Sequence, residues 1–450
     1  MKRSTWHRIK TWRLAYPVML SQFGQIMVAT ADSIMVGRVG TIPLAASTLA
    51  NSIFLIVFVF GIGISYAVSP LVANADGEKN TKRISSLLKH AVYINAALGL
   101  VLTGIVLIFN FNLHWFDQDI RVEKSALSYM FIINMSLLPT MLFFAFKQFA
   151  EGLSSTKPAM IITLVTNALN ILLNYLLIYG KFGLPAMGLD GAGYATLIAR
   201  FLMMGGIAWL VIANNPFRKY WKAIKWKRIQ WDTFNRILKI GVPSGMQMVF
   251  EVGAFAGAAV MAGWISPQAQ AAHNIAINLA SISYMVATGL AAATTVRVGN
   301  QLGRRDIQSL RTAGFTGIKM VIWIMLIAGV LLFAGKDLLP KLYVTDETVI
   351  QIASSLLIVA VVFQLSDGIQ VIGLGALRGL EDVKIPTFIT LIAYWVFGLP
   401  VGYLAGIIGP FGVDGIWYGL ASGLTVSAIL LIWRFDRVTK KLKKRVKTNA

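Results

Sequence analysis

Three acidic residues, Asp32, Glu251 and Asp367, lie within long apolar stretches of this sequence. Their surroundings read VATADSIMVG, MVFEVGAFAG and FQLSDGIQVI. An ionisable side chain in the hydrocarbon region of a membrane is costly, so it persists where it faces a bundle interior or a wet cavity. Such residues usually bind ions or substrate. These acids therefore indicate a membrane transporter.

Glu251 and Asp367 form a candidate cation site. Counted along a helix from the cytoplasmic start of its span, Glu251 lies about 20 Å deep, and Asp367 lies at a similar depth. Two carboxylates at one level could share a cation or a proton, because like charges at close range disfavour double ionisation. Asp32 lies about 27 Å along its own span. The alternative is that each acid pairs with a buried base or caps a broken helix. Arg200 and Lys319 are the only bases well inside predicted spans.

Three asparagines in the segment TNALNILLNYLLIYG form a second candidate element. Asn167, Asn170 and Asn174 recur at steps of three and four residues, so on a helix they share one face. This face could hydrogen-bond Asp32 and line a hydrophilic cavity. The alternative is that the amides join neighbouring helices, as they commonly do in membranes.

Side chains around Glu251 could contact an organic cation. Met248 precedes Glu251 by about one helical turn, and Tyr284 lies in a neighbouring span. Met and aromatic surfaces adapt to cations of varied shape. Ordinary packing is the alternative for each. His273, a lone histidine near the end of a span, is expected to be structural.

Long apolar segments must position these residues. Of 450 residues, 56% are hydrophobic and 13% charged, against about 25% charged in soluble domains. The chain has no cysteine, which excludes disulfides and thiolate sites. The first apolar run lacks a cleavage site and is expected to remain as a span. Runs of about 20 apolar residues can cross a bilayer, and we expect twelve spans, near 14–36, 44–73, 90–111, 126–149, 158–180, 191–213, 240–263, 270–296, 314–335, 350–375, 386–408 and 412–433.

The formal net charge of +22 is distributed asymmetrically. With the N-terminus inside, Lys and Arg concentrate in the segments on that side, which are the residues before 14, 74–89, 214–239 and the tail after 433. An excess of Lys and Arg in the cytoplasmic loops of a membrane protein predicts this distribution. Binding to nucleic acid does not require it. We therefore expect both termini in the cytoplasm, a multi-pass position in the plasma (inner) membrane, and no nucleic-acid partner.

The two halves of the chain follow one plan. The longest polar stretch, 214–239, separates six predicted spans from six. Identical residues recur 226 positions apart: Pro17 and Pro243, Met35 and Met261, Gly63 and Gly289, Asn74 and Asn300. An even number of spans per half makes the repeat parallel, as in some secondary transporters. We expect an all-α polytopic membrane protein, with an N-lobe over 1–213, a cytoplasmic linker over 214–239, and a C-lobe over 240–450 that ends in a basic tail.

The acids do not follow the repeat. Under the same offset, with one residue of adjustment for the last pair, Asp32 aligns with Ala258, Glu251 with Gln25, and Asp367 with Thr140. The scaffold is duplicated and the charge is not. Two unequal sites are therefore expected, a single acid in the N-lobe and a pair in the C-lobe.

Several motifs taken together resemble one family. They are ADSIMVG around Asp32, the NxxxN step from Asn170 to Asn174 followed by YGKFG, EVGAFAGAA from Glu251, AAHNIAIN, VRVGNQLG, and SDGIQVIGLGALRGLED around Asp367. The chain resembles the multidrug and toxic compound extrusion (MATE) transporters of the NorM-type branch over essentially its whole length. The resemblance implies a MATE/MOP-type fold of twelve transmembrane helices in two six-helix lobes. It also implies export of organic cations in exchange for Na+ or H+ by alternating access.

The resemblance also assigns site residues. It implies that Glu251 and Asp367 bind the coupling cation, and that Asp32 with Asn170 and Asn174 belongs to a polar cavity of the N-lobe that also takes part in proton or cation coupling. The paired carboxylates of Glu251 and Asp367 favour Na+ as the metal ion. We expect no cofactor beyond the coupling ion. The expected partners are small organic cations and the lipid bilayer, and the expected state is a monomer.

Two other functions are weighed against this one. A lipid-linked saccharide flippase of a related fold should have a broad basic cavity for a pyrophosphate, whereas the buried ionisable groups here are mainly acidic. A membrane enzyme would need a catalytic motif, and the sequence has no nucleotide-binding loop, HExxH motif or nucleophile elbow. We therefore expect no enzymatic activity.

Overall fold

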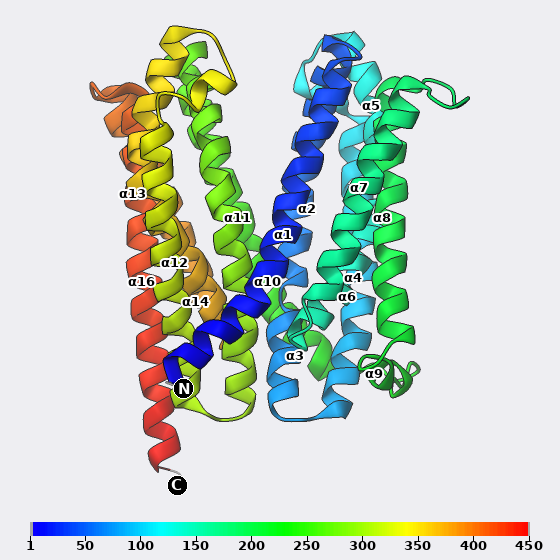
Figure 1. Ribbon diagram of the computed structural model, residues 1–450, viewed down its shortest axis with the longest axis vertical. Helices are drawn as coiled ribbons and strands as arrows, with labels where there is room; N and C mark the ends of the chain where they lie inside the picture. Colours follow the sequence, from blue (N-terminus) through cyan, green and yellow to red (C-terminus); the bar gives the residue numbers. More distant parts are fainter. Residues whose placement is uncertain (1–2, 449–450) are drawn as a thin grey trace. The chain divides into compact units, whose positions relative to one another are not determined.

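The protein is a bundle of long helices in a computed structural model that describes residues 3–448, with side chains described over 5–444 (Figure 1). No strand occurs among these residues. The helices of the first half are α1 Arg3–Gly37, α2 Thr41–Ser65, α3 Val68–Gly77, α4 Thr81–Phe111, α5 Ile120–Asn134, α6 Leu137–Gly152, α7 Lys157–Tyr179 and α8 Gly188–Ala213. Those that follow are α9 Arg218–Lys222, α10 Trp231–Ile265, α11 Pro267–Gly303, α12 Ile307–Gly335, α13 Glu347–Gly379, α14 Lys384–Leu391, α15 Leu399–Tyr403 and α16 Gly412–Thr448. Short 3-10 turns occur at Leu113–Phe116 and Pro340–Leu342.

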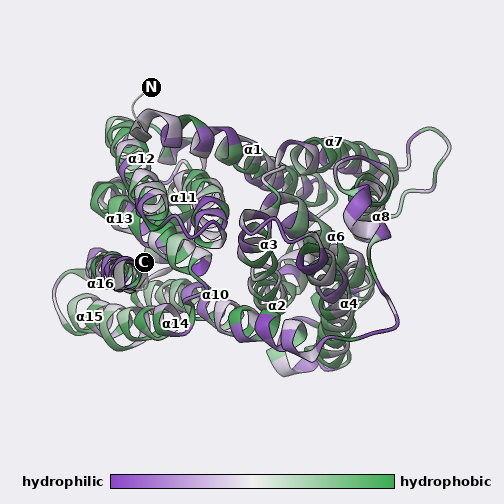
Figure 2. Ribbon diagram, turned by 90° about the horizontal axis from the view of Figure 1, so that it is seen from below, coloured by the Kyte–Doolittle hydropathy of each residue, from purple (hydrophilic) through white to green (hydrophobic). Residues whose placement is uncertain are grey.

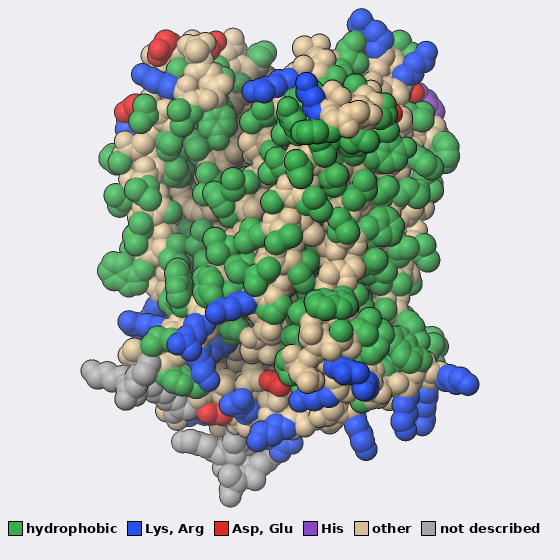
Figure 3. Space-filling model, turned by 45° about the vertical axis from the view of Figure 1, so that its right-hand side comes forward, with side chains coloured by type: hydrophobic (Ala, Val, Ile, Leu, Met, Phe, Trp, Pro, Cys, Tyr) green, Lys and Arg blue, Asp and Glu red, His purple; other side chains and the backbone are tan. Residues whose placement is uncertain are grey.

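Each predicted span coincides with a helix or with consecutive helices, which confirms the all-α polytopic membrane fold. Eleven helical stretches in the described part of the chain are long and apolar enough to cross a membrane. The remaining predicted span, 14–36, lies in α1, whose first turns are rich in Lys and Arg. Hydrophobic residues dominate the helices in Figure 2, and on the face in Figure 3 they cover the helix middles, with Lys and Arg gathered near the ends.

The sequence repeat is visible in the helix bounds. The stretch Thr41–Gly77 and its counterpart Pro267–Gly303 begin and end 226 residues apart. The stretches Ile120–Gly152 and Glu347–Gly379 are 227 apart, which is the one-residue adjustment expected from the sequence. The two halves are therefore built on the same helical plan.

Two helices of the first half are broken where their counterparts are continuous. Breaks at Tyr66 and Met135 separate α2 from α3 and α5 from α6. Pro70 and Pro139 each lie four residues further on. Since proline has no N–H, it cannot bond to the carbonyl four residues earlier. The aligned positions of α11 and α13 carry Val296 and Ser366, so those helices continue.

The eleventh span of the chain, which lies in the second half, is irregular. It runs from α14 through α15 and contains two π-helical segments, Ile392–Gly398 and Leu404–Ile408. This span packs closely on α16, and a Cβ added at Gly419 would lie 2.4 Å from the Cα of Gly402. Small residues permit such close approach of membrane helices.

Residue contacts divide the chain into two compact units. One comprises Met1–Met19 and Met246–Ala450, and the other comprises Leu20–Gly245. Helices α1 and α10 each contribute to both units, and the proline of each helix, Pro17 or Pro243, lies near that division. We refer to these as the C-terminal unit and the N-terminal unit.

The predicted linker packs against the N-terminal unit. Only Arg218–Lys222 of this segment forms a helix before α10 begins. The ammonium of Lys89 on α4 donates to the backbone carbonyls of Lys225 and Arg228. Tyr93, one turn further along α4, donates to the carbonyl of Trp226 at 3.2 Å. The segment is therefore held by hydrogen bonds from side chains of one helix to its backbone carbonyls.

The predicted basic tail is a continuation of α16, which ends at Thr448. The first turns of α1 are held nearby in the C-terminal unit by Arg297 of α11, whose guanidinium donates to Thr11 Oγ1 at 3.0 Å and to the carbonyl of His7 at 2.5 Å. Figure 1 shows the first turns of α1 and the last turns of α16 at the same end of this unit.

Candidate functional site

The C-terminal unit contains the acid pair predicted from the sequence. Glu251 on α10 and Asp367 on α13 are both 6% exposed. Each carboxylate acts electrostatically on the other across the packed helices. Helices α10 and α13 thus place two acids in one buried region, which can hold a positive charge.

Polar side chains from three helices surround Glu251. Tyr284 of α11 donates its hydroxyl to Glu251 Oε1 at 3.3 Å. Gln247, one turn earlier on α10, also hydrogen-bonds the carboxylate. Arg378 of α13 donates to Gln247 Oε1 at 3.4 Å, and its charge acts on Glu251. The carboxylate is therefore oriented by neighbours on both sides.

Asp367 is less well satisfied than Glu251. Its Oδ1 is buried and has no hydrogen-bond partner in the described part of the chain. Gln364 and Gln370, at steps of three residues on the same helix, are 1% and 0% exposed, and each keeps an amide oxygen without a partner. A buried acceptor without a donor is costly. This face of α13 is therefore suited to receive a cation or proton donor.

The two glutamines were not singled out in the sequence. The available signal was their spacing, since Gln364, Asp367 and Gln370 recur at three-residue steps, close to the three- and four-residue steps that identified the asparagines of α7. Gln370 donates to the hydroxyl of Tyr394 at 2.7 Å, which connects α13 to the irregular eleventh span. The charges of both acids act on Tyr394 as well.

Aromatic rings pack beside the acid pair. Phe255 contacts Phe363 and Tyr394, with ring centroids 6.0 Å apart in each case. Trp417 contacts Phe363 and donates its indole N–H to His273 Nδ1 at 3.1 Å. His273 is buried in this packing, which agrees with its structural interpretation. Met248 is partly exposed on α10, about one turn from Glu251.

The N-terminal unit contains the single acid. Asp32 on α1 is half-buried, and Asn174 on α7 donates its amide to Asp32 Oδ1. The same amide nitrogen lies 3.3 Å from Asn170 Oδ1, so the two asparagines act together. Asn167, a further turn along α7, is partly exposed, and its amide nitrogen has no partner in the described chain. The asparagine stripe therefore reaches Asp32 through its last member.

A half-buried base partly offsets the charge of Asp32. The positive charge of Arg200 on α8 acts on Asp32, and Tyr129 of α5 also interacts with it electrostatically. Arg200 donates to Ser136 Oγ at 2.5 Å and stacks 5.0 Å from the ring of Phe54. The sequence left open that each acid is offset by a base and does not bind an ion. This alternative applies to Asp32 more than to Glu251 and Asp367.

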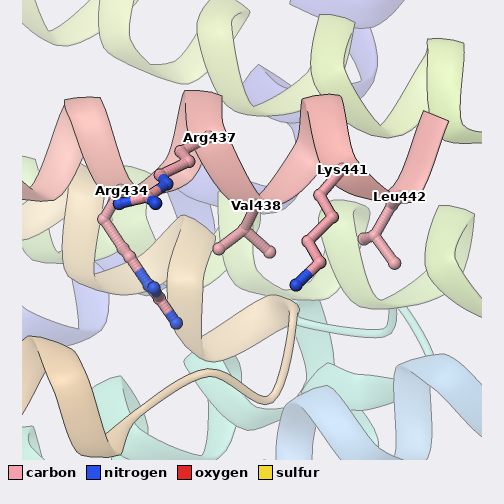
Figure 4. A pocket seen from close by; sticks show the side chains of 5 residues that line it. All are labelled: Arg434, Arg437, Val438, Lys441 and Leu442. Atoms are coloured by element: carbon pink, nitrogen blue, oxygen red, sulfur yellow. The ribbon is translucent and has the colours of Figure 1, made fainter. Parts of the chain in front are cut away.

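A conventional metal cluster is absent from the described residues, where no three His, Cys, Asp or Glu side chains converge. A cation between Glu251 and Asp367 would be held by these carboxylates, with Tyr284 and glutamine oxygens nearby. Two pockets open elsewhere in the C-terminal unit. One is lined by residues of α16 (Figure 4), the other by residues of α1, α12 and α16, and neither is lined by the three acids.

Comparison with known proteins gives a consistent result. The MatE family model matches residues 17–176 and 243–404. The chain is 36% identical to the probable multidrug resistance protein NorM of Rhodopseudomonas palustris, covering 98% of this chain and 94% of that protein. It is 33% identical to the multidrug resistance protein NorM of Vibrio parahaemolyticus, covering 93% of each chain.

Solved structures show the same fold. A crystal structure of a MATE transporter in the straight conformation superposes with a TM-score of 0.90 at 21% identity, covering 97% of each chain. The eukaryotic MATE transporter AtDTX14 gives a TM-score of 0.88 at 19% identity, covering 99% of this chain and all of the other.

The fold and these matches define a multi-pass membrane protein of the transporter class rather than an enzyme. The chain belongs to the MatE family. Its two family-model matches fall one in each half of the chain, as the internal repeat predicts.

Proposed function

We propose that the protein exports organic cations of varied structure from the cell in exchange for Na+ or H+. The observation that carries this proposal is the buried pair Glu251 and Asp367, in which Asp367 Oδ1 lacks a partner among the described residues. The relatives named above are multidrug resistance proteins, which supports varied drugs as substrates. The flippase alternative is not retained, because the buried groups at this site are acidic.

The exchange follows from competition for the acids. A coupling cation that binds between Glu251 and Asp367 cancels one unit of their negative charge, and a cationic drug is then attracted less strongly to the pair. A ligand shifts an equilibrium between two conformations only by its differential affinity for them. If the drug prefers one conformation and the coupling ion the other, each drives release of the other, and the coupling is reciprocal.

Asp32 has a different role in this proposal. Its charge is already partly offset by Arg200, and Asn174 holds its orientation. We infer that this group, with Asn170 and Asn167, lines a polar cavity through which the drug or a proton passes. Tyr284 and Met248 would contact the drug near Glu251, since a phenol and a thioether are polarisable surfaces for a cation.

The membrane setting is part of the proposal. The Lys/Arg bias favours a bacterial-type inner membrane orientation with both termini in the cytoplasm. The hydrogen-bond partners of Glu251 and Asp32 come from described residues of one chain, so we propose that the monomer is the working unit.

Transport in proteoliposomes tests this function. Purified protein is reconstituted with ethidium, and a Na+ gradient or an H+ gradient is imposed in separate experiments. We expect flux driven by at least one gradient in the wild type and none in Glu251→Gln. No flux under either gradient, with the protein shown to be inserted, would contradict the exporter.

A further inference from the structure

Lys319 has no role in the proposed export. It lies on α12, 12 residues after the helix begins at Ile307, which is about 18 Å along the axis. Its side chain is exposed. Trp323, Ile327 and Val330 follow on the same face and are 69%, 60% and 68% exposed. Lys319 therefore belongs to a face that the other residues mark as lipid-facing.

A free ammonium on such a face is stabilised by an anionic neighbour or by the polar headgroups. Charged side chains within spans are costly, and long basic side chains reach towards the polar headgroups to reduce that cost. No acid pairs with Lys319 in the described chain. Its side chain instead lines a pocket of about 360 Å³ formed by α1, α12 and α16.

The pocket is strongly basic. Four basic side chains and no acid line it, together with two threonine hydroxyls: Arg8, Arg311, Lys319, Lys443, Thr312 and Thr316. Arg311 is fixed by Asp436 at 2.6 Å and by Thr439 Oγ1 at 2.5 Å. Asp436 thus offsets one of the four positive charges. The other three bases have no acidic partner among the described residues.

A neighbouring pocket is a useful contrast. It measures about 340 Å³ and is lined by Arg434, Arg437 and Lys441 along α16 (Figure 4). Arg434 donates to Asp382 at 2.8 Å, and Arg437 stacks 5.0 Å from the ring of Trp433. Two of its three bases are therefore engaged with other side chains, whereas three of the four bases in the first pocket have no acidic partner among the described residues.

We propose that the pocket of α1, α12 and α16 binds the phosphate of an anionic membrane phospholipid, with the acyl chains along the Trp323 stripe. Clustered bases beside membrane helices bind such headgroups, at about fivefold in affinity per base near the surface. The apolar stripe above the bases favours a lipid over a soluble phosphate. None of the residues of this pocket has a role in the proposed export cycle.

Native mass spectrometry of the purified full chain tests the site. The probes are phosphatidylglycerol, phosphatidylcholine and inorganic phosphate. The wild type is compared with Lys319→Gln and with the triple variant Arg8→Gln, Lys319→Gln, Lys443→Gln. Lys319→Arg keeps the charge, and Lys341→Gln removes an exposed charge from the 3-10 turn Pro340–Leu342, outside the pocket.

We expect the wild type to bind phosphatidylglycerol in preference to phosphatidylcholine. The triple variant should lose on the order of 100-fold in affinity, Lys319→Gln about fivefold, and Lys319→Arg and Lys341→Gln little. Equal binding of the two lipids by the wild type would overturn the proposal, as would unchanged binding by the triple variant. Full displacement of the lipid by an equal concentration of inorganic phosphate would show that the site takes a soluble anion instead.

Discussion

The two acid sites of this protein are built by opposite means on the same helical plan. In the N-terminal unit one carboxylate, Asp32, is held by an amide and offset by Arg200. In the C-terminal unit two carboxylates lie buried together, and one oxygen of Asp367 has no partner among the described side chains. A satisfied acid has little reason to bind another cation, whereas an incompletely satisfied pair has. We infer that the coupling ion binds to the pair.

The helices of the two units are also interrupted at different places. The N-terminal unit has its proline breaks in α2–α3 and α5–α6, while the C-terminal unit keeps the equivalent helices α11 and α13 unbroken. The unbroken helices are the ones that carry Tyr284 and Asp367. The C-terminal unit instead places its π-helical segments in the eleventh span, beside Tyr394. A continuous helix fixes the depth of the residues that it carries, which suits a coordinated ion.

Neutralising the acid pair should have the largest effect. We expect Glu251→Gln or Asp367→Asn to abolish drug efflux, because either change removes a charge that both ligands require. Ethidium efflux from cells or proteoliposomes measures the loss, and membrane fractions show whether the protein inserts. Wild-type export by both variants would exclude the competition mechanism.

Neutralising the single acid should separate the two sites. We expect Asp32→Asn to lower transport by on the order of 10- to 100-fold while the response to the coupling ion persists. The reason is that Asp32 lies in the other unit and is already offset by a base. Loss of the ion response in this variant would mean that both units share one ion site.

Removing the amide that holds Asp32 should have an intermediate effect. Asn174→Ala leaves the carboxylate without its donor, and a lost hydrogen bond to a buried charged group costs about 1–3 kcal/mol. We expect transport to fall about tenfold. Leu172→Ala is the matched control, since this apolar side chain lies on α7 and is 52% exposed. Equal losses in the two variants would indicate a general effect on α7.

Removing the phenol beside Glu251 should have the smallest effect. Tyr284→Phe deletes one hydrogen bond of 3.3 Å and keeps the ring. We expect the apparent affinity for the coupling ion to change by about fivefold or less, since such a bond contributes about 1 kcal/mol. The ion dependence of ethidium efflux measures it. A complete loss of transport would show that the hydroxyl has a direct role that its geometry does not suggest.

Much of the fold could be predicted because apolar length and Lys/Arg distribution determine it. The twelve spans and the repeat follow from local sequence, and the helix bounds repeat at the same offsets. The breaks at Tyr66 and Met135 were missed, although Pro70 and Pro139 in the sequence are their cause. Proline inside an apolar run does not by itself break a helix, since Pro17 lies inside α1.

The sites were predictable in part. A carboxylate within an apolar segment can be recognised from the sequence as a candidate site residue. The spacing of the asparagines predicted that one face of α7 contacts a polar partner. The neighbours of Glu251 were less accessible, because Gln247 and Arg378 meet only when α10 and α13 pack together. The same limitation hid the contact between Trp417 and His273, which depends on residues 144 positions apart. The roles of all these residues stay predictions.

The most direct measurement of the central claim is ethidium binding to the purified protein with and without the coupling ion. Na+ is titrated at constant pH, and pH is varied at constant Na+, for the wild type, Glu251→Gln, Asp367→Asn and Asp32→Asn. The ratio of the Kd values with and without the ion reports the competition. We expect one of the two ions to weaken ethidium binding to the wild type and to Asp32→Asn, and to have no effect on the pair variants. A response that disappears in Asp32→Asn and persists in Glu251→Gln and Asp367→Asn would contradict the assignment of the ion to the pair.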